Sequence, residues 1–261
     1  PRASCDHAVS DTVKDSGMER ALSVATARDV SVFQVGGLYL VTACDSLGAI
    51  GRKPADVVTS PEAICGSYTL RVCLSELAAV GATPILVMSL VSNEWEPTGR
   101  EILESIKTEL DVDGYTDVAI TGSTEENMPT TMTGLGIAVV GTAPSLRWRR
   151  TRPGDTLFLV GRPWVGQEVL EHGTELLTPA VVRLLAADDV VGDFLPCGSR
   201  GIAHEVEVLE RESGTKVLLD ERWPYLNKSA GPATCGIVTV HQATLSSSLG
   251  LTRLGTIGRA Q

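Results

Sequence analysis

The amino-acid sequence predicts a globular protein that combines helices with sheets, of the α/β or α+β class. Of its 261 residues, 43% are hydrophobic and 26 are glycine, which fits one large domain or two of ordinary size. Aromatic residues make up only 4%, so Val, Leu, Ala and Ile must fill the core. This composition suits sheets covered by helices and disfavours an all-β lectin-like module.

The first twenty-odd residues are polar, and we expect a loosely packed arm or one that becomes ordered on binding. After this arm, residues 30–35 and 38–44 are two β-rich segments, and Gly36-Gly37 between them predicts a hairpin. The second strand leads into Asp45 and then into a glycine-rich loop.

A helix follows, with Ser60 as its N-cap, Pro61 at its first position, Val80 at its end and Gly81 as its stop. Residues 84–92 are then predicted to be a buried strand.

A second, amphipathic helix should begin near residues 98–100, because apolar and charged side chains alternate there with helical spacing. Residues 117–123 and 134–143 are predicted to be two further strands. They flank a polar loop of sequence TGSTEENMPTTMT.

The arginine-rich segment 147–152 after Pro144 predicts a linker, so a second domain is expected to start at about residue 146. A solvated linker is the favoured interpretation of this segment, and an anion site is the alternative. The elements expected beyond it are a strand within 152–161, helices at 179–187 and 201–212, and strands at 216–219, 234–240 and 252–257.

Acidic side chains stand at the ends of apolar segments or inside them, namely Asp29, Asp45, Glu76 and Glu125. Carboxylates next to a core cost free energy unless positive charge compensates them, and hard oxygen ligands are what hydrated Mg²⁺ with a polyphosphate requires. Taken singly, each could instead cap a turn or face solvent. Glu76 is the hardest to explain in this way, because Arg71 is the only other charged residue between Ile64 and Ile85 and the spacing is not i, i+4. The set favours a magnesium-nucleotide site.

The net charge of −10 and a pI near 4.9 argue against nucleic acid as a partner. No apolar stretch reaches the roughly 18 residues of a membrane span, so a cytoplasmic protein without a membrane partner is expected. The six cysteines contain no CxxC pair, which indicates reduced core residues rather than a zinc site or a disulfide framework.

Several motifs resemble the ATP-binding superfamily of aminoimidazole ribonucleotide (AIR) synthetase, thiamine monophosphate kinase, selenophosphate synthetase and a hydrogenase maturation protein. They are Arg-Asp-Val-Ser-Val at 28–32, Ala-Cys-Asp-Ser at 43–46, Ser-Glu-Leu-Ala-Ala-Val-Gly-Ala-Thr-Pro at 75–84 and Thr-Gly-Ser-Thr-Glu at 121–125. Their order and spacing match the superfamily over nearly the whole chain.

The resemblance implies a two-domain α+β, AIR-synthase-like fold. Residues 1–145 would form an N-terminal ATP- and metal-binding domain, whose mixed sheet joins that of a second subunit in a homodimer. Residues 146–261 would form a C-terminal α/β domain that closes over the site. ATP and Mg²⁺ would be the cofactors.

The resemblance also assigns residues. Asp29, Asp45 and Glu76 match metal-binding carboxylates, although Glu76 replaces the usual Asp. Ser123 replaces an acidic residue or His, and we expect Glu125 to restore that charge at the metal. The expected nucleotide-binding residues are Asp45, Ser46, Gly48, Gly51, Thr121, Gly122, Ser123 and Thr124.

Within the superfamily, Cys44–Gly51, Thr121–Glu125 and Lys228–Thr234 resemble α-ribazole kinases, which phosphorylate the 5′-hydroxyl of α-ribazole in the salvage of the lower ligand of cobalamin. The expected substrate is therefore a small, nucleoside-like molecule. Other phosphoryl-transfer, ligase or dehydratase members of the superfamily are the alternative, as is a nucleotide-binding protein without catalysis.

The expected catalytic residues are Lys53, His204 and Lys228. Each lysine could neutralise a phosphate or be a surface charge, and His204 could be a general base or an ordinary residue at a helix start. Arg71 is expected to pair with Glu76 or, alternatively, to reach a phosphate. The chain lacks a Walker-type phosphate loop, protein-kinase motifs and a Gly-x-Ser-x-Gly elbow, which excludes those folds.

Overall fold

The computed structural model describes residues 24–220, 223–241 and 250–260. The arm predicted for the first twenty-odd residues lies outside this part of the chain. Over these ranges no helix is long and apolar enough to cross a membrane.

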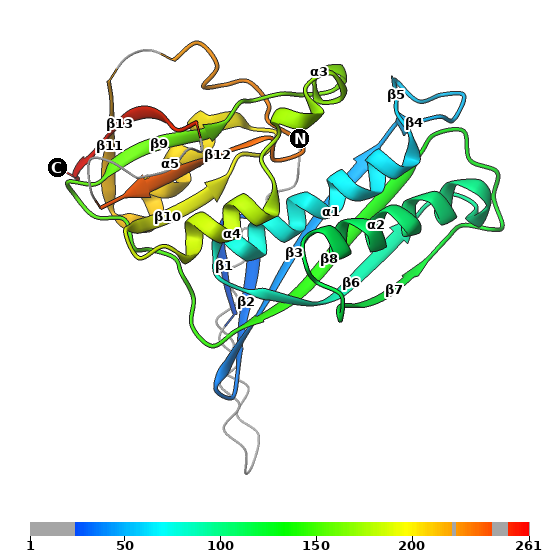
Figure 1. Ribbon diagram of the computed structural model, residues 1–261, viewed down its shortest axis with the longest axis horizontal. Helices are drawn as coiled ribbons and strands as arrows, with labels where there is room; N and C mark the ends of the chain where they lie inside the picture. Colours follow the sequence, from blue (N-terminus) through cyan, green and yellow to red (C-terminus); the bar gives the residue numbers. More distant parts are fainter. Residues whose placement is uncertain (1–23, 221–222, 242–249, 261) are drawn as a thin grey trace.

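A six-stranded mixed sheet is built from the first half of the chain (Figure 1). In spatial order its strands are β1 (Val24–Ala27), β2 (Val30–Val35), β3 (Leu38–Gly48), β8 (Gly134–Ala143), β6 (Thr83–Val91) and β7 (Ala119–Ser123). Only β6 and β7 pair in parallel; the other neighbours are antiparallel. The predicted β2–β3 hairpin around Gly36-Gly37 is confirmed, because Val35 pairs with Leu38.

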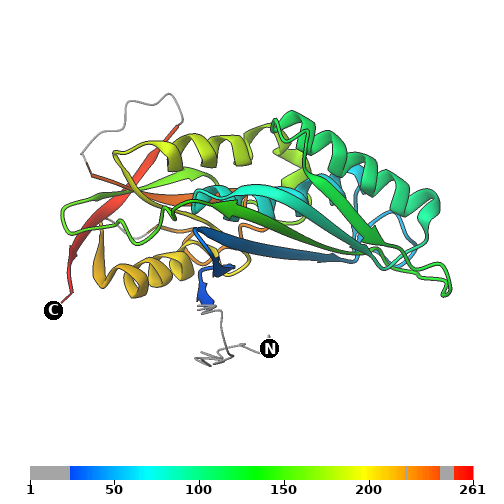
Figure 2. The same ribbon diagram turned by 90° about the horizontal axis from the view of Figure 1, so that it is seen from below.

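Two helices, α1 (Glu62–Ala79) and α2 (Arg100–Val112), cover one face of this sheet, as Figure 2 shows from below. A short π-helical turn, η1 (Trp95–Gly99), precedes α2, and the two-stranded pair β4 (Ile50–Gly51) and β5 (Val58–Thr59) precedes α1. The predicted capping of α1 is wrong: Pro61 is the N-cap, and no side chain caps the helix.

The second half of the chain forms a five-stranded sheet. Its spatial order is β10 (Val191–Pro196), β12 (Cys235–Val240), β9 (Thr156–Gly161), β13 (Thr252–Arg259) and β11 (Thr215–Leu219). Its helices are α3 (Gln167–Glu171), the 3-10 turn η2 (Gly173–Glu175), α4 (Pro179–Ala187) and α5 (Gly201–Ser213).

The α/β character predicted for this half needs correction, since all four strand pairs are antiparallel. Strands β9 and β10 run in the same direction, but β12 lies between them and pairs antiparallel with both. The helix-containing connection from β9 to β10 therefore joins strands that are not neighbours.

Helices cover both faces of this second sheet. On one face, α4 and the C-terminal end of α1 pack against Phe158, Phe194 and Val238. On the other face, α5 packs through Ile202 and Leu209. Because both faces are covered, β10 and β12 are buried at every position.

The arginine-rich segment connects the two sheets and packs between them rather than being freely solvated. The backbone N–H of Arg147 donates to the Val80 carbonyl at the end of α1. The backbone N–H groups of Arg150 and Thr151 donate to Asp193 of β10. The segment is thus bonded to both halves of the chain, while the domain boundary at 145/146 stays a prediction.

Candidate active site

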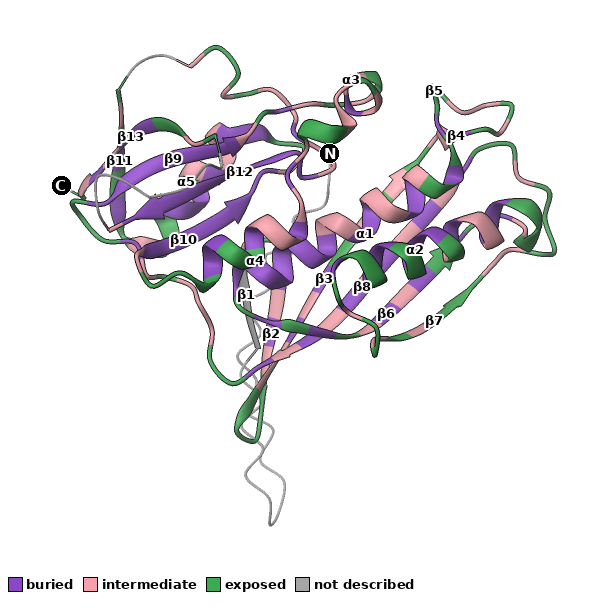
Figure 3. Cartoon of the chain, in the orientation of Figure 1, coloured by how far each residue is buried: buried purple, intermediate pink, exposed green. Residues whose placement is uncertain are grey.

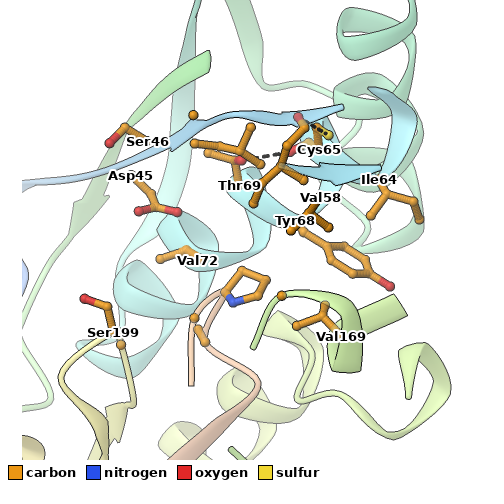
Figure 4. Close-up of a pocket in the computed structure, with 18 of the residues that line it drawn as sticks. Asp45, Ser46, Val58, Ile64, Cys65, Tyr68, Thr69, Val72, Val169 and Ser199 are labelled. Atoms are coloured by element: carbon orange, nitrogen blue, oxygen red, sulfur yellow. Dashed lines mark hydrogen bonds between the residues drawn. The ribbon is translucent and has the colours of Figure 1, made fainter. Parts of the chain in front are cut away.

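A cavity of about 550 Å³ lies between β3 and α1 on one side and loops of the second half on the other. Figure 4 shows Asp45 of β3 and Ser199 at one end of it, and Tyr68, Ile64 and Val169 at the other. The cavity is thus lined by both halves of the chain, with a polar end and an apolar end.

Four carboxylates from four separate elements line the polar end, namely Asp29, Asp45, Glu76 and Glu205. Asp29 lies in the turn between β1 and β2, Glu76 on the buried side of α1, and Glu205 in the first turns of α5. Glu76 and Glu205 are only 6% and 5% exposed, whereas the Asp29 side chain is 55% exposed.

The carboxylates repel one another electrostatically. Burial, followed by the charges of Asp29 and Glu205, raises the pKa of the Glu76 carboxyl well above its usual range, against the opposing effect of Arg28. Burial and the charge of Asp29 raise the pKa of Glu205 to about 7. A group of acids whose pKa values are raised by mutual repulsion is stabilised by a bound cation.

A magnesium ion fits this donor set. All four groups offer hard oxygen atoms, and Mg²⁺ in nucleotide sites is commonly held by one or two carboxylates, with water and phosphate oxygens completing the shell. Among the described residues, no three His, Cys, Asp or Glu side chains stand close enough to ligate a metal ion as a ready-made cage. The carboxylates therefore suit a hydrated ion that arrives with a ligand.

Arg200 is the one cationic side chain among the described residues that line the cavity. Its guanidinium lies 3.8 Å from Asp29, and its side chain is 60% exposed. A polyphosphate placed among four carboxylates and one arginine would be repelled, so its binding requires a divalent cation.

The apolar end is formed by α1, by β4 and β5, and by the α3 segment. Its side chains include Ile50, Val58, Ile64, Tyr68, Val72, Val169 and Leu170. Thr69 lies beside them, but its hydroxyl donates to the Cys65 carbonyl at 2.8 Å. A flat, uncharged ring matches such a surface better than a charged group does.

Two glycine-containing loops of the second half close the cavity, at 198–200 and 231–233. The first follows β10 and leads directly into α5, where the N–H groups of Gly201 and Ala203 donate to the Gly198 and Leu226 carbonyls and are therefore used within the fold. Gly201 at the start of α5 has φ +77°, and a Cβ there would lie 2.6 Å from the Lys228 carbonyl, so glycine is needed.

The three predicted catalytic residues are not among the residues that line the cavity. Lys53 donates from Nζ to Glu94 at 2.6 Å, and Lys228 pairs with Glu168 at 2.8 Å. His204 adjoins the lining residue Glu205, and burial together with Arg200 lowers the pKa of its imidazole. Their catalytic roles stay predictions.

Residues 121–125 also lie apart from the cavity of the same chain, at the edge strand β7 and the loop after it. Gly122 packs so closely on β6 that a Cβ would meet the Ser89 carbonyl oxygen at 2.2 Å. Glu125 Oε1 accepts from the N–H groups of Asn127 and Met128, so this side chain orders its own loop. The metal and nucleotide roles of Thr121, Gly122, Ser123, Thr124 and Glu125 stay predictions.

Of the other predicted nucleotide-binding residues, Asp45, Ser46 and Gly48 line the cavity and Gly51 does not. A Cβ on Gly51 would lie 2.1 Å from Thr133 Oγ1, so close packing explains this glycine. The N–H of Ala49 donates to the Thr133 carbonyl and is therefore used within the fold.

The predicted pairing of Arg71 with Glu76 is wrong. Arg71 donates to both carboxylate oxygens of Glu109 on α2, at 2.5 and 3.0 Å. The spacing of five residues places Arg71 on the α2 side of α1 and Glu76 on the cavity side. Glu76 therefore faces the cavity without an ion pair to Arg71.

Glu205 is the candidate carboxylate that the sequence did not single out, although the resemblance implied that the segment 199–205 around His204 lies near the cleft. The strand before this segment, β10, was not predicted, because its sequence Val-Gly-Asp-Phe-Leu-Pro contains Gly, Asp and Pro.

No family model matches the chain, and no curated protein matches it in sequence. Solved structures match in fold. AaThiL complexed with AMPPCP and TMP has a TM-score of 0.65 at 15% identity, covering 90% of this chain and 85% of that one. Thiamine monophosphate kinase from Aquifex aeolicus gives 0.63 at 15%, covering 88% and 89%. A HypE–HypF complex gives 0.62 at 13%, covering 89% and 88%.

These similarities establish an AIR-synthase-like α+β fold with two sheets, as the sequence motifs predicted. At such identities the likeness shows the fold alone and singles out no member of the superfamily. AMPPCP, an ATP analogue, is bound in the first of these neighbours.

Proposed function

We propose that this protein is an ATP- and magnesium-dependent enzyme that transfers a phosphoryl group to the hydroxyl of a small, uncharged acceptor. The observation that carries the proposal is the cavity, in which four carboxylates from four elements face an apolar end. The binding of AMPPCP and TMP by a neighbour with the same fold supports it.

In this proposal Asp29, Asp45 and Glu76 surround a hydrated magnesium ion that arrives with the nucleotide, and the ion would supply charge neutralisation of the phosphate oxygens. Glu205 adds a fourth carboxylate from the second half of the chain. Because phosphoryl transfer depends mostly on placement, closure of the second half over the cavity would exclude water from the reacting groups.

We propose more specifically that the acceptor is α-ribazole and that it is phosphorylated on its 5′-hydroxyl. The apolar end of the cavity suits a neutral heterocyclic ring, and its described lining residues include no lysine that would favour an acceptor already carrying phosphate. Lys228 lies close to the lining loop 231–233 and remains a candidate for contacting the acceptor, as Lys53 and His204 remain candidates for catalysis.

The test is a panel of nucleosides and vitamin precursors, including α-ribazole and thiamine monophosphate, incubated with the protein and Mg-ATP. We expect ADP release only when the mixture contains a compound whose hydroxyl group accepts phosphate. Mass spectrometry should then show a product that is heavier than this compound by the mass of one phosphoryl group, about 80 Da. Transfer to thiamine monophosphate alone would contradict the acceptor assignment and leave kinase activity in place. Orthophosphate without a phosphorylated product would indicate the ligase or dehydratase alternative, and nucleotide binding without turnover would indicate a non-catalytic protein.

We further propose a homodimer formed through the open face of the first sheet. Leu90 of β6 is 55% exposed, and Leu40, Met88 and Val140 on the same face are half-buried. An apolar sheet face of this kind is commonly covered by a partner. Sedimentation of the purified protein over a range of concentrations tests this, and a monomer at all concentrations would contradict it.

A further inference from the structure

Arg28 is a buried arginine next to the candidate metal ligand Asp29, in the turn between β1 and β2. Its side chain is 2% exposed. Nη1 donates to the Phe194 carbonyl at 2.7 Å, Nη2 to Asp193 at 2.7 Å and Nε to Glu212 at 2.9 Å. A turn of the first sheet is thus fixed to β10 and α5 of the second half by three charge-assisted bonds.

The backbone of Arg28 is strained. Its φ is +56°, in the left-handed region that glycine and asparagine adopt more easily than arginine does. A two-residue turn between strands would be more favourable with glycine at such a position. Strain of this kind persists where the surrounding contacts fix the residue, and it occurs often at functional sites.

The anchor of Arg28 is itself fixed. The second carboxylate oxygen of Asp193 accepts from the N–H groups of Arg150 and Thr151 and from the Thr151 hydroxyl, at 3.0, 2.8 and 2.5 Å. The connection between the two sheets, β10 and the β1–β2 turn therefore meet at one buried carboxylate. Movement of the second half relative to the first would move Arg28 and, with it, Asp29.

The guanidinium also acts on the cavity. Its charge lowers the pKa values of Glu76 and Glu205, in opposition to the carboxylates around them. Arg28 does not line the cavity. Its positive charge therefore acts on the carboxylates that line the cavity and does not contact a ligand.

We propose that Arg28 is a positioning residue: held by Asp193 and Glu212, it fixes Asp29 at the mouth of the cavity and supplies a permanent positive charge behind Glu76 and Glu205. This inference rests on the proposed function, because it takes the carboxylates to be the magnesium site. The β1–β2 turn would then couple the relative position of the two halves to the position of the metal ligand Asp29.

The experiment measures binding of AMPPCP by calorimetry, with and without Mg²⁺, for the full chain and for Arg28→Gly and Arg28→Lys. Glycine relieves the backbone strain and removes the side chain, while lysine keeps the charge and loses the planar fork. We expect the gain in affinity that Mg²⁺ gives to fall roughly tenfold in Arg28→Gly and less in Arg28→Lys, because the ligands lose their placement. Binding without Mg²⁺ should change little.

A second variant tests the anchor without touching the cavity. Glu212→Gln weakens the contact to Arg28 Nε, and we expect a smaller loss, about threefold, in the same magnesium-dependent gain. Glu207→Gln, the same change at an exposed position of α5, is the control and should bind like the parent protein. Thermal unfolding of each variant shows that it is folded.

An arginine with a merely structural role would lower the melting temperature and leave the magnesium dependence of the folded protein unchanged. The inference is therefore overturned if the gain in AMPPCP affinity on adding Mg²⁺ is unchanged in both Arg28→Lys and Glu212→Gln. If the Arg28 variants do not fold, an unchanged gain in Glu212→Gln alone overturns it. If the parent protein does not bind AMPPCP in magnesium, the proposed function fails and this inference fails with it.

Discussion

The two sheets of this protein differ in how their faces are covered. Along β8 of the first sheet, half-buried and buried residues alternate, whereas every residue of β12 in the second sheet is buried (Figure 3). Helices α1 and α2 cover one face of the first sheet, while α4 and α5 lie on opposite faces of the second (Figure 2). Among the described elements, no helix covers the other face of the first sheet.

The two halves therefore have different tasks. The second sheet is complete within one chain and presents stable loops, such as 198–200, to the cavity. The first sheet and its helix α1 supply Asp29, Asp45 and Glu76 to the cavity, and the sheet leaves an apolar face open. Substitutions that are matched between the two halves can test this division.

The largest expected effect is that of a charge in the second sheet. Val238 of β12 is fully buried, so Val238→Asp should cost about 4 kcal/mol or more of unfolding free energy, because no partner can compensate the carboxylate. Urea denaturation followed by circular dichroism measures the loss. A variant that does not fold at all agrees with the expectation.

The matched change is Val140→Asp in β8, where the side chain is half-buried on the open face. It should cost the isolated chain less than about 1 kcal/mol, since the carboxylate can stay hydrated. It should also weaken the proposed dimer in sedimentation. Equal losses of unfolding free energy for the two valine variants would show that the open face is covered within the chain, and would contradict the difference between the two sheets.

The next effect concerns two of the buried glutamates on the helices that cover the first sheet, Glu76 of α1 and Glu109 of α2. Glu109 is paired with Arg71, whereas Glu76 lies among other carboxylates. Glu76→Gln should raise the melting temperature by a few degrees, about 2–4 °C per kcal/mol, because it removes a poorly compensated buried acid. The same substitution should lower the affinity for Mg-ATP at least roughly tenfold, as functional sites often reduce stability.

Glu109→Gln is the control of opposite sign. It leaves Arg71 without its carboxylate partner and should lower stability by about 1–3 kcal/mol, with nucleotide affinity unchanged. Thermal unfolding and calorimetry together separate the two glutamates. Loss of stability in both variants would mean that Glu76 has a structural partner after all.

Much of the first half could be predicted from the sequence, because its signals are local. Gly36-Gly37 fixes the β2–β3 hairpin, and the alternation of β8 and the amphipathic pattern of α2 identify them directly. Asp45 and Glu76 were recognised because a charge inside an apolar segment is conspicuous without any knowledge of its partners.

The rest depends on contacts between distant segments. β10 contains Gly, Asp and Pro, residues that locally favour turns, and it forms a strand because Phe194 and Leu195 are buried on opposite faces of the sheet. Glu205 sits in an ordinary amphipathic helix, and only its placement opposite α1 distinguishes it from Glu207. The sequence left open whether Arg71 meets solvent, a phosphate or Glu76, and only the packing of α2 places Glu109 beside it.

The last expected effect lies in the helix layer that covers the closed face of the first sheet. Asp113 ends α2, where a negative charge opposes the helix dipole, and one of its carboxylate oxygens is buried without a hydrogen-bond partner. Burial and the nearby Glu109 raise the pKa of Asp113 to about 6, against the charges of Arg183 and Arg71. The folded chain therefore holds this proton more tightly than the unfolded chain does.

Between about pH 4 and pH 6 the unfolded chain has lost the Asp113 proton and the folded chain still binds it, so stability falls as the pH rises. Asp113→Asn should consequently stabilise the protein at pH 7 by about 1–3 kcal/mol, and this gain should disappear as the pH approaches 4. Asp111→Asn, the same change at an exposed position two residues earlier, should leave stability nearly unchanged at both pH values. Melting curves at pH 4.5, 6 and 7.5 decide it. A gain that is independent of pH would show that the neutral side chain, and not its charge, causes the cost. A gain confined to neutral pH locates the cost in the buried charge of Asp113 at the C-terminal end of α2.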